Sequence, residues 1–330
     1  MSARLRPLFI NAARILISLA LLAWLLFSAD VQRLGAILRG ADLRVYAACM
    51  VISAGGMLLR ALRWKVMLDA ARARVSFRRA LYLCYVGAFF NTFLPTGLGG
   101  DVIRVLEVGP GATPQQATGT ILVERLTGFV VLFALMLLVL PAASAALPGP
   151  TVALLALLAV GVLAAGALVL EGRLLRRLLA RLPLPRALSL AGDTWLGQTY
   201  DVITASGPRA IALALGISLI FNVSIIFSNW LVARALGLAV PVGVVAVALP
   251  VISATLLVPV SISGFGVREG VVILLLAQAG VAAAPALALS LAWYSLDVTD
   301  GLCGGAIYLA ASLLGLRPRS SAASLSNKLP

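Results

Sequence analysis

The ionisable residues that lie within apolar sequence gather around two breaks rich in glycine and proline. The first break carries Asn91, Gly99, Gly100, Asp101 and Arg104. Asp101 and Arg104 are three residues apart, which allows them to pair on one face of a helix. A guanidinium beside open backbone amides suits a phosphate, because it donates paired hydrogen bonds to phosphate oxygens. We therefore predict that Arg104 binds a phosphate and that this break forms half of a headgroup site.

The second break repeats this chemistry in the C-terminal half of the chain. Here Arg268 is the predicted phosphate ligand. Both breaks should expose helix N-termini, whose amides and dipole attract anions. Glycines at these positions would allow a headgroup to approach the bare backbone. The predicted headgroup-binding residues of this break are Ser261, Ser263, Gly264, Gly266, Arg268 and Glu269.

More charged residues follow each break in the next apolar run. Glu124 and Arg125 come after the first break, and Asp297 and Asp300 come after the second. A charged group inside a membrane costs about 2.5–3.5 kcal/mol on insertion scales, so such residues need partners or a function. We predict that these four balance the arginines at the breaks, meet a cationic headgroup, or carry a coupled proton.

A purely structural interpretation of these charges stays open. The pairs Asp101–Arg104 and Arg268–Glu269 would then only allow the broken segments to pack. Arg125 would extend its side chain to the aqueous surface. The sequence does not decide between these two interpretations.

The composition of the whole chain is that of an integral membrane protein. Of its 330 residues, 62% are hydrophobic and 12% are charged, against about 45–50% and about 25% in soluble domains. Histidine is absent, which excludes histidine metal sites and histidine bases. We predict no metal, no cofactor and no nucleic-acid partner. The three cysteines lie in apolar runs and are expected to be buried and unpaired.

Apolar runs predict an all-α polytopic fold with about six full spans. The second run ends in a basic cluster with Trp64, which is typical of a helix end at the headgroups. Residues 30–44 are predicted to form a short interfacial helix. Residues 171–209 are predicted to form a cytoplasmic amphipathic segment, and residues 315–330 are predicted to form a polar tail. The predicted spans are 8–27, 45–59, 120–140, 151–170, 211–232 and 287–314.

The positive charges indicate how the chain is oriented. Seven Lys or Arg residues lie in 60–79 and six in 171–209, and three lie at each terminus, so 19 of 26 fall on one side. Cytoplasmic loops carry the Lys/Arg excess, so we place both termini in the cytoplasm. The uncharged loop 141–150 is placed outside the cell membrane.

This orientation requires two hairpins that enter the membrane and turn back. Residues 80–118 must start and end in the cytoplasm, whereas residues 240–284 must start and end outside. Each stretch contains one of the two breaks, where proline and glycine interrupt a helix. We therefore predict two re-entrant helical hairpins that enter from opposite sides.

The order of elements is the same in both halves, although their orientation is opposite. We predict a single transmembrane domain, residues 1–314, built as an inverted repeat of residues 8–140 and 151–314. Inverted repeats with paired broken segments are common in secondary transporters, where the breaks mark the binding site. The small-residue spacing of Gly301, Gly304 and Gly305 is more typical of close helix packing than of binding.

Several motifs resemble the lysylphosphatidylglycerol synthase transmembrane (flippase-like) family. They are Gly-Gly-Asp-x-x-Arg within Asn91–Arg104, the segment Val123–Gly128, and Gly-x-Gly-x-Arg-Glu within Val260–Glu269, together with Arg60-Ala-Leu-Arg-Trp64. The resemblance implies movement of lipids between leaflets, with aminoacylated phosphatidylglycerol as the best-known cargo. Two-part members carry a soluble aminoacyl-transfer domain, for which the polar tail leaves no room, so lysine transfer is not expected. The resemblance to stand-alone members of the family implies hopanoids or polyprenyl-linked lipids as other cargoes.

Together these features predict a lipid translocase of the inner, cytoplasmic membrane rather than an enzyme. An anionic, aminoacylated or isoprenoid lipid would cross by alternating access between the two hairpins. The sequence contains no Gly-x-x-x-x-Gly-Lys-Ser/Thr loop for nucleotide phosphates. The alternatives are an intramembrane enzyme that acts on lipid phosphate or glycolipid, and an accessory subunit of a lipid-synthesis enzyme.

Overall fold

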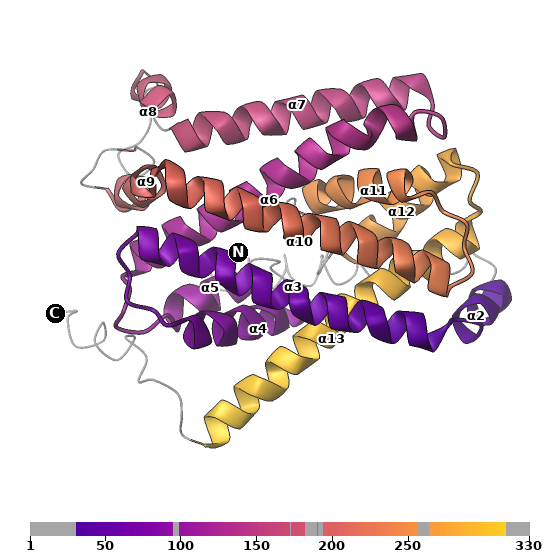
Figure 1. The fold of residues 1–330 in the computed structure, drawn as a ribbon, viewed down its shortest axis with the longest axis horizontal. Coiled ribbons are helices and arrows are strands. Elements are labelled where there is room, and N and C mark those ends of the chain that lie inside the picture. The colour runs from indigo at the N-terminus through magenta and orange to yellow at the C-terminus, as the bar shows by residue number, and fades with distance from the viewer. Residues whose placement is uncertain are drawn as a thin grey trace, which may run out of the picture.

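A computed structural model describes residues 31–94, 99–171, 173–181, 190, 194–256 and 264–314. Within these ranges all regular secondary structure is helical (Figure 1). The predicted all-α fold is therefore confirmed. The first predicted span, 8–27, and the tail, 315–330, lie outside the described residues.

Four of the described helices are long and apolar enough to cross a membrane, and the chain is thus a polytopic membrane protein. A 23-residue helix extends about 35 Å, which exceeds the roughly 30 Å hydrocarbon core. Helix α13 (Ala283–Leu313) has the length of a span, with 31 residues, but carries two aspartates. The total of six spans stays a prediction. The four helices are α3 (Leu43–Ala70), α6 (Pro114–Ala143), α7 (Gly149–Glu171) and α10 (Gly207–Ala235).

Helix α3 differs from the sequence prediction at its C-terminal end. The run 45–59 was expected to end in a basic cluster facing headgroups, but the helix continues to Ala70. Arg63 is only 4% exposed and Trp64 is 0% exposed. The prediction that these two residues lie at a membrane surface is wrong, because polar partners on α6 receive them inside the protein.

The first break separates two antiparallel helices, α4 (Phe77–Phe93) and α5 (Gly99–Leu106). The Arg74 N–H donates to the Gly111 carbonyl at 2.7 Å, which joins the entry and the exit of this hairpin. An eight-residue helix such as α5 extends only about 12 Å and cannot cross a bilayer. The pair therefore starts and ends at one end of the molecule, as predicted for a re-entrant hairpin.

The second break separates α11 (Val242–Thr255) from α12 (Val267–Gln278). This hairpin begins beside the start of α3, where the Asp42 N–H donates to the Ala235 carbonyl at 2.8 Å. The first hairpin instead begins beyond the far end of α3. Figure 1 shows that the two hairpins open at opposite ends of the molecule.

The contacts between helices also correspond between the two halves. The first arm of each hairpin packs on the long last helix of the other half, α4 on α13 and α11 on α6. The second arm packs on the long last helix of its own half, α5 on α6 and α12 on α13. Helices α3 and α10, which correspond to each other, pack together. The short helices α2 (Val31–Arg39) and α9 (Trp195–Ala205) follow the same rule, on α13 and α6 respectively. This correspondence supports the predicted inverted repeat.

The two polar segments form short helices that are not spans. Residues 30–44 contain α2, and residues 171–209 contain α8 (Arg173–Ala180) and α9. Arg176 of α8 forms an ion pair with Asp201 of α9. The described helices that lie wholly within these two segments are thus too short to cross a membrane.

The glycines of α13 pack directly against α4. A Cβ atom at Gly304 would lie 1.9 Å from the Tyr85 carbonyl oxygen, and one at Gly305 would lie 2.7 Å from the Phe89 ring. Only a residue without a side chain allows this approach. The packing interpretation of the small-residue spacing is confirmed.

Candidate headgroup site

Arg104 of α5 lies at the centre of a buried cluster of charges between the first hairpin, α3 and α6. Its Nη2 lies 2.6 Å from Glu124 Oε2, and its Nη1 lies 3.2 Å from Asp101 Oδ1. Asp101 also pairs with Arg125. The predicted pairing of Asp101 with Arg104 is thus present, and Arg125 is held by the same carboxylate. The charged cluster consists of Arg60, Arg63, Asp101, Arg104, Glu124 and Arg125.

Trp64 fixes the plane of the Arg104 guanidinium. The Arg104 Cζ lies 4.1 Å from the centre of the indole ring, in a cation–π arrangement. The Trp64 Nε1–H donates to Thr120 Oγ1 at 3.1 Å, so the indole is itself held by α6. Arginine is suited to this position because its flat guanidinium stacks and donates within its plane at the same time.

Glu124 connects the cluster to the second half of the chain. Its Oε1 accepts from Arg63 Nη2 at 3.0 Å and from Arg60 Nε at 3.3 Å. The other terminal nitrogen of Arg63 donates to Ser218 Oγ on α10 at 2.9 Å. Because α3 and α6 belong to one half and α10 to the other, Arg63 joins the two halves at the site.

The charged cluster has more positive than negative groups. It contains four guanidiniums and only two carboxylates, which leaves a formal surplus of two positive charges. The Nε atoms of Arg63, Arg104 and Arg125 are buried without a hydrogen-bond partner among the described residues. Buried charge without compensation is costly. An anion beside these arginines would complete both the charge and the hydrogen bonding.

The two arms of the first hairpin touch at glycines. The Asn91 Oδ1 accepts from the Gly100 N–H at 2.8 Å. A Cβ atom at Gly100 would lie 1.9 Å from the Gly87 carbonyl oxygen. Gly99 and Gly100 are buried, so the close approach in this structure is between α4 and α5. A role for Asn91, Gly99 and Gly100 in headgroup binding stays a prediction.

The second hairpin places a similar group of side chains on α12 and α13. Arg268 Nη2 lies 3.0 Å from Glu269 Oε1, and the Arg268 Cζ lies 4.0 Å from the centre of the Tyr294 ring. Glu269 Oε2 accepts from the Gly266 N–H at 2.7 Å and so caps the start of α12. Arg268 Nη1 lies 4.0 Å from Asp297 Oδ2. An arginine held by carboxylates and an aromatic face thus occurs at both hairpins.

The turn before α12 has the backbone that glycine permits. Gly264 and Gly266 have φ angles of 78° and 81°, in the left-handed region that other residues rarely adopt. Ser261 and Ser263, which were also predicted to bind a headgroup, lie outside the described residues.

Arg60 lies between the two half-sites. Its side chain is 23% exposed, and its only hydrogen bond within the described chain joins Nε to Glu124. It also interacts electrostatically with Asp297 and Asp300 of α13. The Asp297 side chain is 70% exposed, while Asp300 accepts from Ser53 Oγ at 2.6 Å. The terminal nitrogens of Arg60 are therefore the donors best placed to meet a ligand that reaches both half-sites.

The sequence pattern favoured a membrane-surface position for Arg60, Arg63 and Trp64, which were not among the predicted site residues. A signal was nevertheless present. Arg60 and Arg63 are three residues apart and thus share one helix face, while the chain offers few buried acids to receive them. What could not be read from the sequence is which acid this face meets, since Glu124 lies about sixty residues further on.

Comparison with known proteins supplies one broad match and one partial match. The family described as the lysylphosphatidylglycerol synthase TM region matches residues 11–299. The UPF0104 membrane protein PH1989 of Pyrococcus horikoshii is 23% identical over 128 residues. That second match covers 38% of this chain and 38% of the archaeal protein.

Proposed function

The chain belongs to the lysylphosphatidylglycerol synthase TM region family, and from this premise we propose that it is a lipid translocase of the cytoplasmic membrane. Its cargo would be a phospholipid or another lipid with a phosphate, such as a polyprenyl-phosphate derivative. A lipid-related role agrees with the family, whereas translocation itself is our proposal. Both chain termini would lie in the cytoplasm.

The surplus positive charge of the charged cluster is the observation that carries this proposal. A lipid phosphate beside Arg60 would add negative charge where four guanidiniums share two carboxylates. Arginine forks match phosphate oxygens in charge and in hydrogen-bond geometry. The apolar tails would remain in the bilayer, since only the headgroup needs a polar environment.

Entry of the two hairpins from opposite sides of the membrane, as predicted above, would supply the second requirement of translocation. A headgroup bound at Arg60 would reach Glu124 and Arg104 on one side, and Asp297 and Arg268 on the other. Rocking of one half against the other would open this site to each leaflet in turn. Inverted repeats are suited to such a movement, because each half can take the position that the other half held.

An enzyme acting on lipid phosphates is the alternative from a different class. Such an enzyme needs a carboxylate free to act as a base. Asp101, Glu124 and Glu269 each accept from arginine, and Asp297 is the most exposed acid of the site. A subunit that only supports a lipid-synthesis enzyme is the third class. Both alternatives predict no translocation by the isolated chain.

Translocation by purified protein in liposomes tests the proposal. A fluorescent phosphatidylglycerol is placed in one leaflet, and its appearance in the other is followed by quenching with dithionite. Loss of charge-assisted hydrogen bonds in Arg60→Gln should slow movement roughly tenfold or more. Arg268→Gln should do the same. Lys65→Gln is the matched control, because Lys65 lies on the same helix but pairs with the exposed Asp69.

Mass spectrometry of the same liposomes separates the three classes. The proposal expects unchanged lipid masses, movement by wild type and by Lys65→Gln, and slow movement by both arginine variants. A chemically altered headgroup would instead establish the enzyme. Absence of movement by folded wild-type protein, or equal movement by all variants, would contradict a headgroup site at these arginines.

A further inference from the structure

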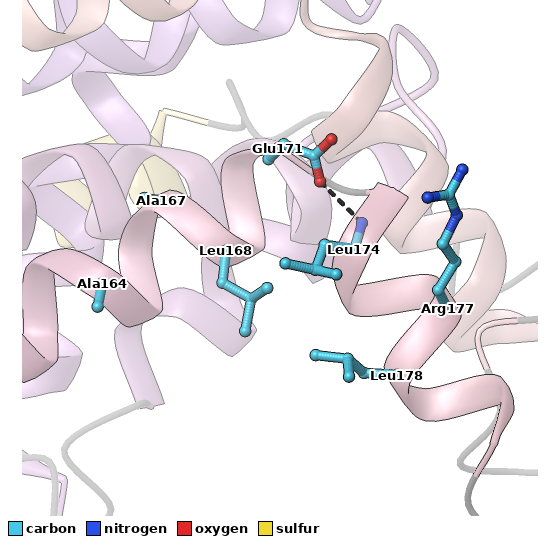
Figure 2. A pocket seen from close by; sticks show the side chains of 7 residues that line it. All are labelled: Ala164, Ala167, Leu168, Glu171, Leu174, Arg177 and Leu178. Atoms are coloured by element: carbon cyan, nitrogen blue, oxygen red, sulfur yellow. Dashed lines mark hydrogen bonds between the residues drawn. The ribbon is translucent and has the colours of Figure 1, made fainter.

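An apolar groove lies outside the candidate headgroup site, between the end of α7 and the short helix α8 (Figure 2). Its volume is about 770 Å³, within the range of about 300–1,000 Å³ that is usual for ligand sites. Alanines of α7 leave this space open, and leucines of both helices border it. The apolar lining consists of Ala164, Ala167, Leu168, Leu174 and Leu178.

The position of α8 places the groove at the depth of lipid headgroups. Helix α7 is a 23-residue apolar span that ends at Glu171, and α8 begins two residues later. The Leu174 N–H donates to Glu171 Oε2 at 2.7 Å, which fixes the corner between the two helices (Figure 2). A short basic amphipathic helix at the end of a span lies in the membrane interface. The groove therefore faces acyl chains on one side and headgroups on the other.

The charges beside the groove favour an anionic occupant. Glu171 also lines the groove, but its carboxylate accepts from the Leu174 N–H at the start of α8, and Arg176 is paired with Asp201. Arg177 lines the groove, and it has no ion pair with a described residue. Arg181 follows at the end of α8 and is exposed. Arg177, which has no carboxylate partner among the described residues, thus lies where the phosphate of an interfacial lipid would lie.

We propose that this groove binds one anionic phospholipid that is not transported. An acyl chain would lie against the alanines and leucines, and the phosphate would accept hydrogen bonds from Arg177. A protein segment is a less suitable occupant, because the groove opens at the end of a span where lipid is the surrounding solvent. This lipid site is separate from the charged cluster and does not depend on translocation. It would anchor α8 to the cytoplasmic leaflet.

Native mass spectrometry of the purified protein with dioleoylphosphatidylglycerol tests this site. Arg177→Ala should weaken retention of this lipid about fivefold, the effect of one basic residue near an anionic surface. Ala167→Trp should abolish retention by filling the groove with a side chain that a membrane helix tolerates. The matched controls are Arg181→Ala, which removes an exposed charge outside the lining, and Ala165→Trp, which adds the same ring on another face of α7.

The proposal expects dioleoylphosphatidylglycerol to be retained more strongly than dioleoylphosphatidylcholine by wild type and by both controls. Equal retention of the two lipids would show ordinary boundary lipid and would overturn the proposal. Retention unchanged in Ala167→Trp would overturn it as well, as would equal losses in the groove variants and the controls. Thermal unfolding of each variant in the same detergent verifies that all four are folded.

Discussion

At the scale of single residues, one carboxylate holds the candidate headgroup site together. Glu124 is 1% exposed and accepts from three arginines on two other helices. Two of these arginines are also held elsewhere, Arg104 by the Trp64 ring and Arg63 by Ser218. The geometry of these arginines, and hence their readiness to bind an anion, therefore depends on Glu124.

Neutralising this carboxylate should destabilise the protein strongly. Glu124→Gln leaves the volume almost unchanged but removes the charge that balances Arg63 and Arg104. Breaking a buried ion pair from one side costs about 3–5 kcal/mol, so the free energy of unfolding should fall by that amount. Denaturation in mixed micelles measures this change. Asp69→Asn is the control, because its partner Lys65 is near the surface and the loss should stay below about 1 kcal/mol. Equal losses of unfolding free energy in both variants would contradict the central structural role of Glu124 in the site.

Some pairings of the site could be predicted from the sequence, and others could not. Asp101 with Arg104 and Arg268 with Glu269 are neighbours on one helix, so their spacing was sufficient. Arg63 meets Glu124 across 61 residues, and no local pattern carries that information. The sequence also favoured a surface position for Trp64, because an indole near arginines is typical of a membrane interface. Only tertiary packing places it beneath Arg104.

At the scale of elements, the first hairpin depends on helices that approach without side chains between them. Gly100 of α5 touches Gly87 of α4, and Gly304 of α13 touches the backbone at Tyr85. These contacts place α5 between α4 and α6, which brings Arg104 to Glu124. The breaks themselves could be predicted from glycine and proline. The partners of the packed glycines could not, because they lie on other helices or across the break.

An added methyl group at Gly100 should disrupt the first hairpin. In Gly100→Ala the new Cβ would lie 1.9 Å from a backbone oxygen, which no side-chain rotation can relieve. Overpacking of this kind costs about 1–3 kcal/mol, and we expect lower thermal stability together with slower lipid movement. Gly55→Ala is the matched control, because a Cβ atom at this position of α3 meets nothing within 4 Å. If Gly100→Ala were as stable and as active as Gly55→Ala, this would contradict the close contact between Gly100 and the Gly87 carbonyl.

At the scale of the whole molecule, the charge pattern and the helix contacts lead to the same topology. The distribution of Lys and Arg along the sequence predicts that each broken segment enters and leaves the membrane on the same side. The structure independently brings Arg74 to Gly111 at the base of the first hairpin and Asp42 to Ala235 beside the base of the second. The opposite directions of the two hairpins could thus be predicted from a few charges, whereas the side of the membrane that each hairpin faces stays a prediction. The pairing of α4 with α13 and of α11 with α6 was not.

Alternating access at the candidate headgroup site requires that the two hairpins enter the membrane from opposite sides. Single cysteines at their bases, labelled with a membrane-impermeant maleimide in intact spheroplasts and in inverted vesicles, test this claim. Exposed positions are available at Arg74 and Pro110 for the first hairpin, and at Ala239 and Ala282 for the second. The background carries Cys303→Ser, because Cys303 is exposed while Cys49 and Cys84 are buried.

We predict that cysteines at positions 74 and 110 react only from the cytoplasmic side, and those at 239 and 282 only from the outside. Each hairpin would then begin and end on one side, and the two sides would differ. A hairpin whose two bases react from different sides would be a pair of spans. Reaction of all four positions from the same side would contradict the opposite entry on which alternating access depends.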